Sequence, residues 1–272
     1  MLMSGGASAA PRIQVHGHRG ARAVLPENTL PAFEYAIRVG ADVLEMDLAV
    51  TKDNVLVVSH DPQLDKKICT APAGMPTAIR ELTLSQVKQW DCGTLQNPDY
   101  PKQKPVPGTH IPTLDEVLAL APRGSFEFNI ETKSFPDKPQ LTPDPETFAR
   151  LLVEAIRKHK LESRVIIQSF DFRTLHAAKK LAPQIRLSAL DETGMRNYVS
   201  VAREAGAGII SPQHFLVRKG RVEEAHKAGL QVVPWTANKE SDWDRLIDAG
   251  VDAIISDDPE ALIAHLKRRG LR

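Results

Sequence analysis

The sequence predicts an α/β fold, a (β/α)8 TIM barrel with a small insertion after the second strand. Short β-rich segments alternate with segments of helical periodicity along most of the 272 residues. Glycines follow three of the later predicted helices and precede the next strand, in Ala205-Gly206, Ala228-Gly229 and Ala249-Gly250. The main alternative is an open doubly wound sheet, but no glycine-rich nucleotide loop follows the first strand. A closed parallel barrel therefore fits the pattern best.

Each element of the barrel is predicted from its local pattern. Strands are expected at residues 13–16, 43–50, 125–131, 165–169, 186–190, 208–211, 231–235 and 253–256. Helices are expected at residues 29–39, 114–120, 145–158, 172–181, 196–205, 222–228, 241–249 and 259–267. Pro31 suits the first turn of the first helix, and Gly40 suits its end. An additional β run at 55–59 follows a turn at Asp53-Asn54.

The alternation stops between residues 62 and 110. This stretch is rich in Pro, Lys and Thr and has one weak helical pattern near residues 85–90. A structureless loop of this length is unusual inside a compact domain, so an inserted subdomain or a lid is expected. We therefore expect a barrel over residues 13–272 with an insertion at about 62–110, preceded by a flexible tail at residues 1–12.

The bulk composition excludes several classes of partner. The net charge is +1 and no basic stripe with interleaved aromatics occurs, which argues against a nucleic-acid partner. No apolar run approaches the length of a membrane span. Cys69 and Cys92 could pair in an oxidising compartment or remain thiols in the cytosol, and their pairing stays open. The long insertion, this cysteine pair and the Ala-rich start favour a periplasmic or secreted location over a cytoplasmic one, while oligomeric state is not predicted.

Acidic residues at strand ends predict a metal site. Glu45 and Asp47 are two residues apart on one strand, so both side chains face the same way. Two carboxylates that share a face need a cation or a proton between them. A surface acidic pair would be the simpler interpretation, but Glu131 and Lys133 repeat the same spacing on the next strand of the barrel. Hard divalent ions such as Ca²⁺ or Mg²⁺ prefer oxygen ligands of this kind.

Two histidines also follow β runs. His18 and His60 are candidates for proton transfer near neutral pH. A single histidine at a strand end would more often be structural. Two at corresponding ends, beside Arg19 and Asp61, favour catalysis.

Together, eight short motifs resemble the signature series of the glycerophosphodiester phosphodiesterase family. They are His18-Arg19-Gly20, Glu27-Asn28-Thr29, Glu45-x-Asp47, His60-Asp61, Asn129-Ile130-Glu131-x-Lys133, Gln168-Ser169-Phe170, Trp235-Thr236-x-Asn238 and Ser256-Asp257-x-Pro259. Each motif alone is weakly specific, but their common order over about residues 13–267 is specific.

The resemblance implies a function and assigns roles to residues. It implies metal-dependent hydrolysis of a small-molecule glycerophosphodiester to glycerol 3-phosphate and an alcohol. The implied metal ligands for Ca²⁺ or Mg²⁺ are Glu45, Asp47 and Glu131. The implied acid–base pair is His18 and His60, and the implied substrate-binding residues are Arg19, Lys133, Gln168 and Trp235.

Two alternative functions remain. One is a phosphodiesterase or lyase that acts on lysophospholipids, and the other is a barrel that binds phosphodiesters without catalysis. The first should have an apolar rim, which looks thin because Trp90 and Tyr100 are the insertion's aromatics. The second should have lost a histidine or a carboxylate of the site, and none is missing.

Several neighbouring residues have alternative interpretations. Glu27 and Asn28 could contact the metal site or cap the first helix, and we favour Asn28 or Thr29 as its N-cap. Trp235 could equally be core or a ligand contact. Asp257 and Asp258, which precede Pro259, are expected only to cap the last helix.

Overall fold

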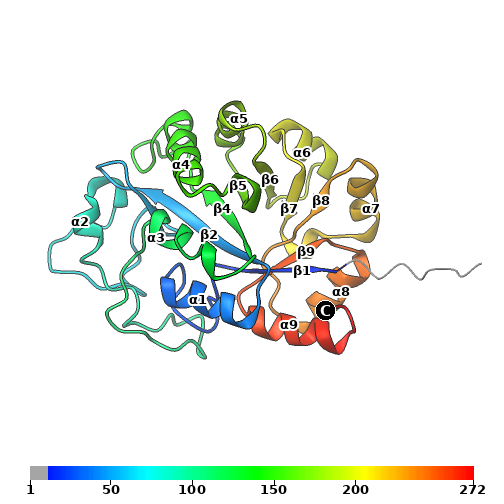
Figure 1. Ribbon diagram of the computed structural model, residues 1–272, viewed down its shortest axis with the longest axis horizontal. Helices are drawn as coiled ribbons and strands as arrows, with labels where there is room; N and C mark the ends of the chain where they lie inside the picture. The colour runs from blue at the N-terminus through cyan, green and yellow to red at the C-terminus, as the bar shows by residue number, and fades with distance from the viewer. Residues whose placement is uncertain (1–11) are drawn as a thin grey trace, which may run out of the picture.

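The computed structural model describes residues 12–272, in which eight parallel strands form a barrel surrounded by helices (Figure 1). The strands are β1 (Gln14–Gly17), β2 (Val43–Val50), β3 (Leu56–Val58), β4 (Glu127–Thr132), β5 (Val165–Ser169), β6 (Arg186–Asp191), β7 (Ile209–Pro212), β8 (Gln231–Val232) and β9 (Ala253–Ser256). Their order is β8-β7-β6-β5-β4-β2-β1-β9, with β3 paired antiparallel to β2 outside the barrel. Backbone hydrogen bonds from Asp252 to Val232 (3.1 Å) and from Ile255 to Pro234 (3.0 Å) bring β8 and β9 together. The predicted eight-stranded parallel barrel is confirmed.

Helices cover the outside of this barrel. The α-helices are α1 (Leu30–Val39), α2 (Leu84–Val87), α3 (Leu114–Leu118), α4 (Pro145–His159), α5 (Phe172–Leu181), α6 (Tyr198–Ala205), α7 (Lys219–Lys227), α8 (Glu240–Ala249) and α9 (Pro259–Arg268). Short 3₁₀ helices occur at η1 (Ile79–Glu81), η2 (Ala121–Arg123), η3 (Glu162–Arg164) and η4 (His214–Leu216). Within the described residues, no helix combines the length and the apolar character that crossing a membrane would require.

Most element boundaries agree with the sequence prediction, and the differences have local causes. The regular part of β8 ends at Val232 rather than residue 235, because Pro234 has no N–H to donate to a neighbouring strand. The extended path still continues, since Val233 and Trp235 donate to β7 carbonyls. Helix α6 begins two residues later than expected, because Asn197 accepts from the N–H groups of Val199 and Ser200 as an N-cap.

The alternation of β2 divides its side chains between two environments. Leu44 and Met46 pack outward in the large core cluster between barrel and helices, which also contains Phe33 of α1. Glu45 and Asp47 therefore face the barrel axis, because successive strand residues point to opposite sides. The axis is filled below them by a separate apolar cluster of Ile166, Ile209, Val233, Ala253 and Ile255. Polar side chains thus gather at the carboxyl ends of the strands, where (β/α)8 barrels build their sites.

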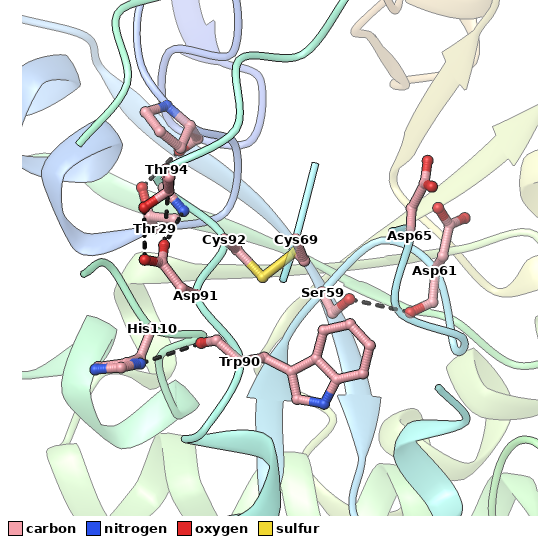
Figure 2. Close-up of a disulfide and its surroundings, with 12 residues drawn as sticks. Thr29, Ser59, Asp61, Asp65, Cys69, Trp90, Asp91, Cys92, Thr94 and His110 are labelled. Carbon is pink, nitrogen blue, oxygen red and sulfur yellow. Dashed lines mark hydrogen bonds between the residues drawn. A yellow bond between two sulfur atoms is a disulfide. The ribbon is translucent and has the colours of Figure 1, made fainter. Parts of the chain in front are cut away.

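The segment expected as the insertion, residues 62–110, contains α2 and lies beside α1 and α3 (Figure 1). It has a small core of its own that includes Ile79, Leu82 and the fully buried Trp90. Cys69 and Cys92, whose pairing the sequence left open, form a disulfide with an S–S distance of 2.04 Å. Figure 2 shows this bond beside Trp90 and Asp91. It links Cys69 in the first part of the segment to Cys92 in its later part.

The expected N-terminal tail falls almost wholly outside the described residues. Of residues 1–12, only Arg12 is described, and its guanidinium lies 2.5 Å from the Asp42 carboxylate. The prediction for residues 1–11 stays a prediction.

Candidate active site

Three buried carboxylates form the centre of the site. Glu45 and Asp47 come from β2 and Glu131 from β4, and the β2–β4 register places Asp47 directly beside Glu131. One oxygen atom from each residue lies within 4.8 Å of the others. The structure therefore brings together the three residues that were predicted as metal ligands.

Two cations border this carboxylate cluster. Lys133 Nζ lies 2.8 Å from Glu131 Oε1 and 3.3 Å from Asp47 Oδ1. Arg19 Nε lies 3.2 Å from Asp47 Oδ2, and the Arg19 backbone N–H donates to Glu45 at 2.9 Å. Both predicted phosphate-binding cations therefore lie at the edge of the carboxylate cluster.

The loop that carries Arg19 depends on a glycine. Gly20 has a φ of 85°, and a Cβ atom there would lie 2.8 Å from the backbone of Ala32 in α1. Only glycine fits such a close approach in this conformation. The His18-Arg19-Gly20 motif therefore combines two predicted site residues with the residue that lets their loop pack on α1.

Burial and neighbouring charges shift the pKa values of the three carboxylates. Burial and the neighbouring Asp47 charge raise the pKa of Glu45 well above its ordinary value, and burial also raises the pKa of Glu131. Burial opposes ionisation of Asp47 as well, but Lys133 and Arg19 hold its pKa well below the ordinary value. A dication between these oxygens would stabilise all three charged forms. The donor set is all oxygen, so the residues fit a hard ion such as Ca²⁺ or Mg²⁺.

Each predicted catalytic histidine is paired with a carboxylate through Nδ1. His18 Nδ1 lies 2.5 Å from Asp257 Oδ1, and its Nε2 points toward the cluster, 3.9 Å from Glu45 Oε2. His60 Nδ1 lies 2.9 Å from Asp61 Oδ1, with 32% of the His60 side chain exposed. Burial lowers the pKa of His18, whereas the His18 charge brings the pKa of Asp257 to about 2 despite the burial of that carboxylate. Both rings are therefore oriented with Nε2 available to a ligand.

Asp257 is a site residue that the sequence did not reveal. The sequence predicted only helix capping for Asp257 and Asp258. This is confirmed for Asp258, which accepts from the Ala261 N–H as the N-cap of α9, and it is wrong for Asp257. The missing signal was the β1–β9 register, which pairs Gly17 with Ser256 and so places Asp257 beside His18.

For the Glu27-Asn28-Thr29 motif, the capping interpretation is confirmed only in the position of Thr29. Thr29 occupies the N-cap position of α1 but makes no side-chain cap, and its hydroxyl donates to the Pro26 carbonyl instead. Asn28 Nδ2 donates to Asp47 at 3.0 Å. Glu27 accepts from Arg19 and Arg22, at 2.6 Å each. Asn28 therefore contacts the carboxylate cluster directly, as the alternative interpretation allowed, and Glu27 is linked to it through Arg19.

Gln168 and Trp235 both line the pocket above the cluster. Gln168 Nε2 donates to Glu45 Oε1 at 2.8 Å, and its own carbonyl accepts from Asn129 at 2.9 Å. Trp235, for which core and ligand contact were both considered, donates from Nε1 to the Ser211 carbonyl and meets Phe170 edge to face at 5.6 Å. Its peptide bond to Thr236 is cis.

The pocket has a volume of about 600 Å³, which suits a small molecule. Its lining combines the charged residues already described with the apolar side chains of Phe135, Phe170, Leu190 and Trp235. A ligand with one anionic and one less polar part would match this combination.

The loops after the strands also expose apolar side chains. Phe170, Met195 and Phe215 are 39%, 84% and 54% exposed, in the loops that follow β5, β6 and β7. The prediction of a thin apolar rim rested on Trp90 and Tyr100 alone, whereas these three exposed side chains lie outside the insertion. Trp90 itself is buried.

Comparison with known proteins agrees with this geometry. The model of the glycerophosphoryl diester phosphodiesterase family matches residues 18–261. A glycerophosphodiester phosphodiesterase of Caldanaerobacter subterraneus subsp. tengcongensis is 37% identical over 256 residues, covering 94% of this chain and 98% of the relative. A protein of the same name from Bacillus subtilis is 33% identical over 277 residues, covering 95% of this chain and 87% of the relative.

Solved structures resemble the fold. A Silicibacter pomeroyi crystal structure, whose name assigns it to glycerophosphoryl diester phosphodiesterases, has a TM-score of 0.89 at 29% identity, covering 96% of this chain and 95% of that one. An Oleispira antarctica phosphodiesterase in complex with the product sn-glycerol-3-phosphate has a TM-score of 0.80 at 24% identity, covering 94% and 97%, and it shows the same fold. With its barrel, its motifs and this family match, the chain belongs to the glycerophosphoryl diester phosphodiesterase family.

Proposed function

We propose that this chain hydrolyses glycerophosphodiesters to glycerol 3-phosphate and an alcohol, with a divalent ion, Ca²⁺ or Mg²⁺, held by Glu45, Asp47 and Glu131. One observation carries the proposal. Two histidines, each paired with a carboxylate, line the same pocket as a buried set of three carboxylates. The names of the relatives support the same reaction class.

The charge of the site suits a phosphodiester. Three carboxylates and a dication leave about one negative charge, and the cations Arg19 and Lys133 change the sign of that sum. A phosphodiester monoanion can then approach without net repulsion. When bound, the ion would supply polarisation of a phosphoryl oxygen.

Arg19 and Lys133 act as the phosphate-binding cations. In the free site Lys133 bridges Glu131 and Asp47, and Arg19 bridges Glu27 and Asp47. These contacts hold both side chains at the edge of the carboxylate cluster, so an incoming phosphate finds them already positioned. Such preorganisation reduces the cost of ordering long side chains on binding.

His18 and His60 transfer the protons. One Nε2 atom accepts the proton of the attacking hydroxyl group, and the other donates a proton to the oxygen that leaves phosphorus. An alkoxide is a poor leaving group, so protonation of that oxygen is essential to the reaction. The Nδ1 contacts to Asp257 and Asp61 fix the ring orientation that both transfers need.

Gln168 and Trp235 complete substrate binding. Gln168 holds Glu45 in place from the β5 side, so its contribution combines pocket lining with orientation of a metal ligand. Trp235 and Phe170 form an aromatic corner that would contact the uncharged part of the substrate.

The exposed apolar groups favour lysophospholipids as a second candidate substrate class. Phe170, Met195 and Phe215 would offer contact area to an acyl chain that extends from the pocket. A lysophospholipase D among the relatives, from Rattus norvegicus and 24% identical, carries that activity in its name.

Product analysis distinguishes the three possibilities. The purified protein would be incubated with glycerophosphocholine, glycerophosphoethanolamine and lysophosphatidylcholine in the presence of Ca²⁺ or Mg²⁺, and the phosphorus products identified by ³¹P NMR. We expect glycerol 3-phosphate from the first two substrates. Lysophosphatidate formed in preference would identify the lipid activity, and a folded protein that binds substrate without forming product would identify a binding barrel.

A further inference from the structure

The carboxylate of Asp257 is held by more than His18. Its Oδ1 atom lies 2.5 Å from His18 Nδ1, while Oδ2 accepts from Asn238 Nδ2 at 2.6 Å and from the Tyr100 hydroxyl at 2.9 Å. Asn238 also accepts from the Asp257 backbone N–H at 2.9 Å. Asn238 therefore binds both the backbone and the carboxylate of Asp257. Tyr100 binds the carboxylate only.

Tyr100 does not come from a strand end. It lies in the 62–110 segment, 157 positions from Asp257 in the sequence. The Arg22 guanidinium lies over the Tyr100 ring, 4.7 Å from its centroid, and the same guanidinium binds Glu27. This stacking places the phenol against the loop that follows β1.

The chain next to Tyr100 is attached to that same loop. Gln103 Nε2 donates to the carbonyl oxygens of Arg22 (2.8 Å) and Leu25 (3.2 Å), and the Lys104 N–H donates to Val24 at 2.9 Å. Since these bonds go to backbone carbonyls, they fix the position of the segment. Tyr100 thus reaches Asp257 from a segment whose next residues, Gln103 and Lys104, are anchored to the loop after β1.

We infer that Tyr100 is a positioning residue for the reaction, so that the 62–110 segment completes the active site. Its hydroxyl holds the Asp257 carboxylate, and Asp257 in turn keeps the proton of His18 on Nδ1 and directs Nε2 into the pocket. Burial and the nearby Asp257 charge raise the pKa of Tyr100, which keeps the phenol a neutral donor. The inference rests on the proposed function, because it assigns Tyr100 a role through the proposed catalytic His18.

The first test removes one hydroxyl group. Tyr100→Phe keeps the ring under Arg22 and deletes the bond to Asp257. We expect kcat for glycerophosphocholine to fall about 10-fold, the scale of a lost hydrogen bond to a charged group, with little change in KM. Tyr35→Phe is a matched control, because the Tyr35 hydroxyl also donates to a carboxylate, that of Glu260, outside the pocket. The control should retain wild-type kcat.

A double-mutant cycle separates positioning from a general structural effect. If Tyr100 acts through Asp257, Tyr100→Phe should cost less than about 2-fold in an Asp257→Asn background. An equal loss in both backgrounds, or unchanged kcat in Tyr100→Phe alone, would overturn the inference while the proposed function stood. A wild-type protein without hydrolysis would instead overturn the proposed function, and this inference with it.

Discussion

His16 makes the stability of the barrel depend on pH in a way that can be calculated. The side chain is fully buried, and neither ring nitrogen has a hydrogen-bond partner among the described residues. Burial lowers the pKa of His16 from 6.5 to about 3, and the Arg186 charge adds to this effect while Asp42 opposes it. The folded protein therefore keeps His16 neutral under conditions in which the unfolded chain protonates it.

The sign and size of this pH dependence follow from the linkage between proton binding and folding. Because the folded pKa is the lower one, the unfolded state binds more protons between pH 6.5 and 3, so the contribution of His16 is fully present above pH 6.5 and is lost as pH falls toward 3. With about 1.36 kcal/mol for each pKa unit, the loss is about 2 kcal/mol at pH 5 and about 3 kcal/mol at pH 4.

The assay compares unfolding free energies across pH. Urea unfolding of the wild type and of His16→Gln would be followed by circular dichroism at pH 7.5, 6, 5 and 4. The wild type should lose about 2 kcal/mol more than His16→Gln between pH 7.5 and 5. His176→Gln, which removes an exposed histidine from α5, controls for loss of one histidine. Parallel pH profiles for wild type and His16→Gln would refute the reasoning.

Three other predictions concern the site and the disulfide. His18→Ala or His60→Ala should lower kcat by at least about 10²-fold with unchanged circular dichroism, because general acid–base catalysis is lost, and near-normal rates would refute the assignment. Glu45→Ala should weaken Ca²⁺ or Mg²⁺ binding in calorimetry by at least about 10-fold, and unchanged affinity would exclude Glu45 as a ligand. Replacing Cys69 and Cys92 by Ser should lower the free energy of unfolding by about 3 kcal/mol, given their separation of 23 residues, and an unchanged urea midpoint would contradict this.

Much of the barrel was predictable because its signals are local. Val43–Val50 carries its buried apolar side chains and its two inward carboxylates within one strand, so pattern and spacing suffice to predict both. Glu131 and Lys133 repeat that spacing at the carboxyl end of β4, which is the direct neighbour of β2. Parallel neighbours align their carboxyl ends, so the carboxylate cluster follows from the fold.

The contacts that were missed depend on pairing between distant parts of the chain. Asp257 meets His18 only because β9 closes the barrel against β1, and helix capping is the more common role of an aspartate before a helix. Tyr100 reaches Asp257 from a segment with almost no regular structure, where periodicity carries no information. For the same reason the sequence left open whether Asn28 contacts the metal site or caps a helix, since its contact to Asp47 requires the folded loop.

The most direct test of the central claim is release of glycerol 3-phosphate from glycerophosphocholine after chelation, followed by restoration of Ca²⁺ or Mg²⁺. The account predicts that chelation abolishes release in the wild type and that one of the two ions restores it. A second reaction with Glu131→Gln would show that any restored activity depends on the carboxylate cluster. Full release by the chelated wild type, or restoration that is unaffected by Glu131→Gln, would contradict the claim that Glu45, Asp47 and Glu131 hold a metal ion needed for hydrolysis.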